Sequence, residues 1–380
     1  METVNLINVQ ESKREKPKAS TVDILRVCAV LGCMWQALIV LLSKGTTGAD
    51  FTHGIMFETI VKYTAATFIF ANVFDLAKLR NIKYGPHMKT KIKNIIIPYI
   101  LWTLVYMYIY MFLLQTSNYK NIWDILQAMI FGTAAPNLWY TVMMFQFELL
   151  VIPIILISQK IQKNKKLVPV LLIIAFIAYF IFLYIYDTFA FKTTNVYLSY
   201  MDRTFIMYSI YGVLGIVAAT YEDKWNKFID KVKYLAIPCI VLVYAISISM
   251  QFSKNPISFD NISYLTPIMF AYNVLMIIIL YALARGIIKY MPKTLTKLKW
   301  LNTYAFRTYL SYIVYLYFSV YIVFGSRIDN IPYIVKLILV YAMTATLTYL
   351  SSFVLHVARV SIWQGLKALV TGKKADIQCN

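Results

Sequence analysis

The chain has 380 residues, of which 60% are apolar and only 14% are charged, and its mean hydropathy is +0.63. Soluble globular domains do not reach this apolar content, so the composition indicates an integral membrane protein. The formal net charge of +20 comes from 37 Lys and Arg against 17 Asp and Glu. Basic loops that meet anionic lipid headgroups explain this charge, and we expect no nucleic-acid partner.

Apolar stretches of about 20 residues, each long enough to cross a lipid bilayer, recur along the whole chain. They predict ten membrane-spanning helices, at 21–43, 57–77, 94–115, 136–158, 167–187, 204–220, 235–251, 264–285, 301–325 and 332–357. A shorter apolar segment at 122–131 is expected at the outer membrane interface. The predicted fold is an all-α integral membrane bundle, and any chemistry must lie within it.

The basic residues divide unequally between alternate loops. Twenty-seven Lys and Arg lie in one set of segments and six in the other, and the richer set is 1–20, 78–93, 159–166, 221–234, 285–300 and 358–380. The positive-inside rule therefore places both termini in the cytoplasm. We divide the chain into a cytoplasmic polar tail 1–20, a membrane domain 21–357 and a cytoplasmic tail 358–380, with an uncleaved first span.

The cysteines give no disulfide framework, because three fall in predicted spans and the fourth lies in the tail: Cys28, Cys33, Cys239 and Cys379. We expect free thiols, no metal site and no permanently bound cofactor.

Arg26 is the most informative residue, because it lies five residues into the first apolar segment. A charge in lipid costs roughly 2.5 kcal/mol or more, so such an arginine suggests a functional site. Asp23 lies three residues earlier on the same helical face and is placed to form an ion pair with it. Snorkelling is the alternative, since Arg26 is only about 7 Å past the helix start.

Other charged residues also enter the predicted spans. Glu148 lies near the middle of the fourth span, where a carboxylate either pairs with a cation, takes up a proton or makes a structural hydrogen bond. Lys62 is expected to snorkel to the outer interface. The three histidines, His53, His87 and His356, are predicted in loops or near an interface, so none is at mid-membrane depth.

Four local patterns then follow one another along the chain: Asp23-Ile-Leu-Arg26-Val-Cys-Ala29, the basic run Lys91-Ile-Lys-Asn-Ile-Ile-Ile-Pro98-Tyr-Ile-Leu-Trp102, Leu138-Trp139-Tyr140, and Asn302-Thr-Tyr-Ala-Phe-Arg-Thr-Tyr309-Leu310. In order and spacing they resemble the motifs of the integral membrane acyltransferase family 3. The resemblance covers about residues 20–357, and the ten spans and cytoplasmic termini agree with it.

Within that family, Tyr211-Gly-Val-Leu-Gly215 followed by Tyr221-Glu222, and the stretch 258–267, are similar to members that work with poly-N-acetylglucosamine in intercellular adhesion. The resemblance implies a membrane O-acyltransferase in a bacterial plasma membrane. It would use cytoplasmic acyl-CoA as donor substrate and a biofilm polysaccharide or lipid-linked glycan as acceptor, with a glycan synthase as a further candidate partner.

The resemblance suggests roles for several residues, and the mid-span position of Glu148 suggests a role for that residue. Arg26 and Glu148 are the candidate catalytic residues, with Arg26 binding the anionic part of the donor or the developing charge. The candidate substrate-binding residues are Asp23, Trp139, Tyr140 and Tyr312.

Three positions depart from the family pattern, because the resemblance implies histidine where this chain has Ala37, Asn137 and Tyr312. Ala37 and the adjacent Gln36 cannot abstract a proton, so Glu148 is the substitute base that the sequence offers. Three hypotheses stay open: an acyltransferase, a catalytically degenerate family member that acts in polysaccharide export, and an unrelated proton- or ion-coupled transporter.

Overall fold

The computed structural model describes residues 17–43, 49–113, 115, 119–191, 193–253, 257, 259, 265–325 and 332–371, and within them it is helical with no strand. Residues 1–16 and 372–380 of the two predicted cytoplasmic tails, Cys379 among them, lie outside the described residues. Cys28, Cys33 and Cys239 are free thiols. The described part of the chain has no cluster of three or more His, Cys, Asp or Glu arranged to hold a metal ion.

The helical elements, in chain order, are α1 Thr21–Ser43, α2 Ala49–Ile60, α3 Thr64–Lys78, α4 Tyr84–Lys91, the π-helix η1 Ile92–Ile96, α5 Ile97–Tyr108, the π-helix η2 Ile109–Leu113, α6 Ile122–Phe131, α7 Trp139–Leu149, α8 Val151–Lys163, α9 Leu167–Ile185, the π-helix η3 Tyr186–Ala190, α10 Val196–Ser199, the 3-10 helix η4 Tyr200–Arg203, α11 Phe205–Thr220, α12 Glu222–Phe252, α13 Pro267–Tyr290, the 3-10 helix η6 Pro292–Thr294, α14 Leu295–Gly325 and α15 Tyr333–Thr371.

The prediction of about ten spans is confirmed. In the described residues nine helical segments are long and apolar enough to cross a membrane, and a bent pair of helices supplies a tenth. Several helices run well beyond the predicted apolar limits; α12, for example, begins at Glu222 rather than near 235. Hydropathy locates the stretch that suits lipid, whereas backbone hydrogen bonding continues the helix into the charged segment beyond it.

The fourth span, predicted as continuous over 136–158, is broken. Helices α7 and α8 meet at Leu150 with a bend of 57°. Pro153 explains the break, because it lacks an N–H and its ring would clash with the carbonyl of residue 149 four positions earlier. The break ends α7 one residue after Glu148.

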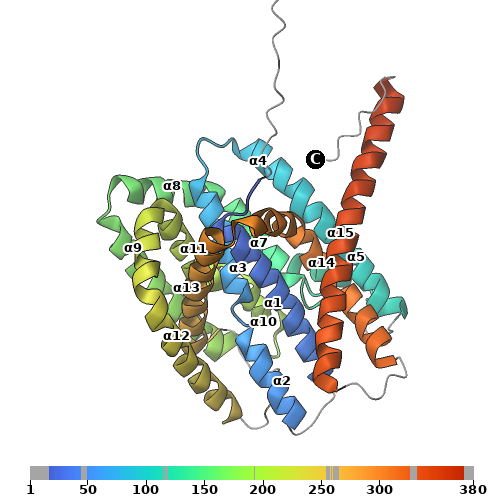
Figure 1. Cartoon of the computed structure of the whole chain (residues 1–380), viewed down its shortest axis with the longest axis horizontal. Helices are drawn as coiled ribbons and strands as arrows, with labels where there is room; N and C mark the ends of the chain where they lie inside the picture. The colour runs from blue at the N-terminus through green and yellow to red at the C-terminus, as the bar shows by residue number, and fades with distance from the viewer. Residues whose placement is uncertain are drawn as a thin grey trace, which may run out of the picture.

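The connections rich in Lys and Arg gather at one end of the bundle, which we call the basic end. Here Lys78 at the end of α3 forms an ion pair of 2.6 Å with Glu222 at the start of α12. The backbone N–H of Ala19 donates to the carbonyl of Leu295, so α1 and α14 begin there as well. Figure 1 shows α4, α8 and the last turns of α15 at this end. We call the opposite end, where α1, α12 and α14 finish, the far end.

Helix α1 occupies the middle of the bundle. It packs against α3, α13, α14 and α15, and in Figure 1 it runs between the α12–α13 pair and the α14–α15 pair. Helix α11 packs closely on α3 because Gly215 has no side chain: a Cβ there would lie 2.7 Å from the carbonyl oxygen of Phe70. Small residues permit such close approach between membrane helices.

Candidate functional site

A cavity of about 530 Å³ lies inside the bundle. Side chains from the second half of α1, the first half of α3, the start of α7 and the middle of α14 line it. Its lining also includes Phe259 and Leu265, which follow the end of α12, so the cavity extends towards the far end. Its volume is that of an ordinary small-molecule site.

Aromatic rings form much of the cavity wall. The ring of Tyr140 lies 4.9 Å from that of Phe68 and 5.5 Å from that of Tyr309, and the rings of Trp139 and Tyr208 are 6.0 Å apart. Tyr and Trp present an apolar face together with a polar tip. Such a wall suits a ligand that combines apolar faces with hydroxyl groups, as a sugar ring does.

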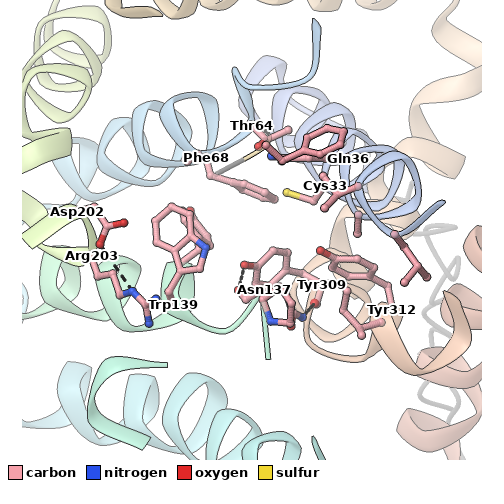
Figure 2. A pocket seen from close by; sticks show the side chains of 18 of the residues that line it. Cys33, Gln36, Thr64, Phe68, Asn137, Trp139, Asp202, Arg203, Tyr309 and Tyr312 are labelled. Atoms are coloured by element: carbon pink, nitrogen blue, oxygen red, sulfur yellow. Dashed lines mark hydrogen bonds and ion pairs between the residues drawn. The ribbon is translucent and has the colours of Figure 1, made fainter. Parts of the chain in front are cut away.

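The three positions at which the resemblance implies histidine meet in this cavity. Ala37 from α1, Asn137 from the turn before α7 and Tyr312 from α14 all line it, and Gln36 lies beside Ala37. Figure 2 shows Asn137, Tyr309 and Tyr312 on one side of the cavity and Cys33 and Gln36 on the other. Residues 100 and more apart in the sequence are therefore neighbours in one site.

Three buried polar atoms of the cavity have no hydrogen-bond partner among the described residues: Asn137 Oδ1, Tyr140 Oη and Asp202 Oδ1, the last of which lies 3.7 Å from Arg203 Nε. The other polar groups of Asn137 are used: Nδ2 donates to the carbonyl of Tyr309, 2.8 Å away, and the Tyr309 hydroxyl donates to the carbonyl of Asn137. Buried polar groups in proteins are normally paired. Asn137 Oδ1 and Tyr140 Oη, unlike Asp202 Oδ1, also have no ion-pair partner among the described residues and are thus placed to meet a ligand.

A tight turn before α7 positions Trp139. Gly132 caps α6 in the left-handed region, with a φ of 64°, and a Cβ on it would lie 2.6 Å from the Cα of Trp139. Glycine is the residue that tolerates both conditions. The turn that follows brings Asn137 and Trp139 onto the cavity wall.

Asp202 and Arg203 also line the cavity, and the sequence analysis did not find them. They lie at the end opposite Tyr312 (Figure 2), with Arg203 Nε 3.7 Å from Asp202 Oδ1. Arg203 is held by a 2.6 Å hydrogen bond to the carbonyl of Phe131, whereas the Asp202 side chain stays 41% exposed. A polar pair between two apolar stretches resembles any loop, so no sequence signal marked it.

Arg26 and Asp23 are placed in a charged cluster at the basic end and are not among the cavity-lining residues. Arg26 donates to the carbonyl of Ala71 at 2.8 Å and to Asp75 at 2.6 Å, both on α3. Asp23, which is buried, accepts from Lys299 at 2.9 Å and from Asn302 at 2.5 Å. Arg26 is therefore bonded within the protein rather than extended to the headgroups.

A comparison with known protein families shows to which family the chain belongs. A family model described as an acyltransferase domain matches residues 20–356. The chain belongs to the acyltransferase-3 family. No curated protein and no solved structure matched it. The family assignment makes the chain acyltransferase-like, and the cavity and the charged cluster are the two places where family chemistry can be sought.

Glu148, the other candidate catalytic residue, also lies outside the cavity lining of this family member. Its carboxylate is 1% exposed and accepts from Lys91 Nζ at 2.8 Å, and it lies 3.2 Å from His87 Nε2. Lys91 immediately precedes the π-helix η1 in the Lys91–Trp102 pattern. Of the outcomes considered for Glu148, the structure shows pairing with a cation.

Tyr140 lines the cavity, and its buried hydroxyl interacts electrostatically with Arg26 and Glu148, which lie outside the cavity lining. Of the candidate substrate-binding residues, Trp139, Tyr140 and Tyr312 lie in the cavity, whereas Asp23 lies in the charged cluster. The sequence could name these residues but could not show which of them share the cavity.

The expectation that Lys62 snorkels is wrong. Its side chain is 0% exposed and lies 3.5 Å from Glu58, which is also buried. The helix unwinds between α2 and α3 at this point, and the Glu58 carboxylate also accepts from Gln36 of the cavity lining at 3.3 Å. An ion pair with its acidic partner one turn earlier makes burial possible.

Proposed function

We propose that this protein is a membrane O-acyltransferase that transfers an acyl group from cytoplasmic acyl-CoA to a hydroxyl of a cell-surface polysaccharide. The observation that carries the proposal is the meeting of Ala37, Asn137 and Tyr312 in one aromatic cavity, with Tyr140 linking that cavity electrostatically to Arg26 and Glu148. The family assignment supports acyl transfer, and a poly-N-acetylglucosamine acceptor follows from the resemblance of 211–222 and 258–267.

The two regions would then serve the two substrates. The positive-inside rule places the basic end in the cytoplasm, where acyl-CoA is found, and the far end outside, where the polysaccharide is exposed. The acceptor would enter the cavity from the far end. Trp139 and Tyr208 would face its sugar rings, and Asn137 Oδ1 and Asp202 would accept hydrogen bonds from its hydroxyls.

Transfer would take place near Tyr140. The acceptor oxygen forms a bond to the thioester carbonyl carbon, the carbon–sulfur bond breaks, and the proton of the acceptor hydroxyl ends on the departing CoA sulfur. Tyr140 Oη would donate a hydrogen bond to the carbonyl oxygen as it gains negative charge, and the nearby Arg26 guanidinium would favour that charge. Glu148 would carry the proton only through Tyr140, since its carboxylate does not line the cavity.

The test uses a host that makes the polysaccharide and from which the gene has been deleted. Wild type, Tyr140→Phe and Arg26→Ala are returned, and the acyl content and the extracellular amount of the polysaccharide are measured separately. We expect either variant to lower the acyl content by at least tenfold while export continues, since one donor to a developing oxyanion contributes about 100-fold or more. Tyr321→Phe, at a site 78% exposed on α14, is the matched control and should behave as wild type.

A second function has an observation in its favour. None of the described cavity-lining residues is a histidine, and Ala37 cannot act as a base. A family member that has lost transfer would keep the cavity as a path for polysaccharide export. In that case Trp139→Ala would cause polysaccharide to accumulate inside the cell while the acyl content of the exported material stayed the same, and this result would overturn the acyltransferase proposal.

A further inference from the structure

Helices α14 and α15 together form a surface with no acidic residue. Neither sequence contains Asp or Glu, although both carry cations. Lys299 is neutralised by Asp23 on α1, and Lys336 lies over the ring of Phe324, 5.6 Å from its centroid. The remaining arginines of the described parts of these helices have no such partner.

Arg307 and Arg359 come together with His356 where the two helices pack. Thr308 Oγ1 donates to Ser352 Oγ at 3.3 Å, and the ring of Tyr304 lies 5.7 Å from that of His356. Arg307 lies one turn after Tyr304 on α14, and Arg359 lies one turn after His356 on α15. Three cationic or potentially cationic groups thus lie around one contact between the two helices, and no described carboxylate forms an ion pair with them.

Arg307 lies six residues into the predicted span 301–325, about 9 Å along the helix, and its side chain is half-buried. His356 Nδ1 is buried and lacks a hydrogen-bond partner among the described residues. Placing like charges near one another at the membrane boundary costs free energy, because partial desolvation and repulsion both oppose it. An anion bound between them would replace the repulsion with attraction and would compensate for the desolvation.

The surroundings suit a ligand that has an apolar or planar part beside its charge. Trp300 and Phe353 are 40% and 38% exposed, and their rings lie 6.0 Å apart. The Trp300 ring is also 5.1 Å from that of Tyr304, which touches His356. Aromatic faces therefore flank the cationic group on its outer side.

We propose that Arg307, His356 and Arg359 form a phosphate-binding site on the α14–α15 pair near the basic end. Arginine binds phosphate through two parallel hydrogen bonds, and an imidazole N–H adds a third. The phosphate comes either from the headgroup of an anionic phospholipid or from a nucleotide such as coenzyme A. The site does not depend on the proposed acyl transfer, because either source would bind whether or not transfer takes place.

The experiment measures binding by the full-length protein in nanodiscs of phosphatidylcholine. One arm titrates coenzyme A and measures its affinity, with every protein carrying Arg26→Ala so that the proposed donor site does not contribute. The other adds phosphatidylglycerol to the nanodiscs and measures, by native mass spectrometry, how much of it stays with the protein. Wild type is compared with Arg359→Gln, with the double variant Arg307→Gln/Arg359→Gln, and with Lys336→Gln on the same helix as the matched control.

We expect wild type to bind at least one of the two probes and the double variant to bind it at least tenfold more weakly, with Lys336→Gln unchanged. Binding of coenzyme A alone identifies a nucleotide, and retention of phosphatidylglycerol alone identifies a lipid. Arg359→Gln removes an exposed side chain, so it tests the site even if the double variant does not fold. Equal binding by wild type and Arg359→Gln, or no binding of either probe by wild type, would overturn the proposal.

Discussion

The charged cluster at the basic end and the cavity towards the far end both include residues of α1, but their polar groups differ in whether they have partners within the protein. In the cluster, and likewise at Glu148, the charges are paired within the protein: Arg26 with Asp75, Asp23 with Lys299, and Glu148 with Lys91. In the cavity Asn137 Oδ1 and Tyr140 Oη have no partner among the described residues. Paired charges hold helices together and set a field, whereas unpaired buried atoms are free to bind a ligand.

The motif residues of α1 are divided between the two regions. Arg26 and Ala37 are eleven residues apart on one helix, which separates them by about 16 Å along its axis. A single motif therefore contributes to both regions. If the family chemistry is retained, the cluster supplies the electrostatics and the cavity holds the acceptor, with Tyr140 of the cavity interacting electrostatically with Arg26.

The largest expected effect is on the charged region. Glu148→Leu removes a buried carboxylate and leaves Lys91 and His87 facing an apolar side chain, so the free energy of unfolding should fall by about 3–5 kcal/mol. Thermal unfolding of the purified protein in detergent measures it. Glu222→Leu, which breaks the exposed pair with Lys78, should cost less than about 1 kcal/mol. Equal losses would mean that the cluster is no more structural than a surface pair.

Arg26→Gln should have the next largest effect. It keeps a side-chain donor but loses the charge that bonds to both Ala71 and Asp75, so about 1.5–3 kcal/mol of stability should be lost. Arg26→Lys should recover only part of it, because an ammonium cannot reproduce the planar fork of a guanidinium. The same thermal measurement applies, and full stability in Arg26→Gln would separate this residue from the structural role of the cluster.

A smaller effect is expected behind the cavity. Gly132→Ala forces a side chain into the left-handed region and against Trp139, which should cost about 1–3 kcal/mol. Gly286→Ala is the control, since nothing lies within 4 Å of the position of its Cβ. Thermal unfolding and the intrinsic fluorescence of the two variants give the measurement. A Gly132→Ala protein as stable as Gly286→Ala would show that this turn does not fix the cavity wall.

The smallest change tests which side each region faces. Ala37→Cys, made in a Cys33→Ala background, should leave stability within about 0.5 kcal/mol of that background. A membrane-impermeant thiol reagent added outside intact cells should label Cys introduced at position 37 through the cavity and should not label Arg26→Cys. Labelling of Arg26→Cys instead would reverse the orientation assigned to the two regions.

The fold was largely predictable because a lipid-spanning helix can be recognised from its local sequence. Each span needs its own run of apolar residues, so the ten stretches could be found without knowing what they touch. Two features of the fold could not be predicted in this way. The break at Leu150 depended on how Pro153 was accommodated, and the burial of Lys62 depended on a buried Glu58 one turn earlier. Neither of these is a property of average hydropathy.

The sequence alone determined the class of the protein, its spans and the family motifs, because apolar composition and short motifs are local properties of the chain. Only the tertiary structure decided that Ala37, Asn137 and Tyr312 share one cavity, that Asp202 lines it, and that Arg26 and Glu148 lie outside it. The physical reason is that helix packing brings together side chains from distant segments, and no local pattern encodes which faces will meet.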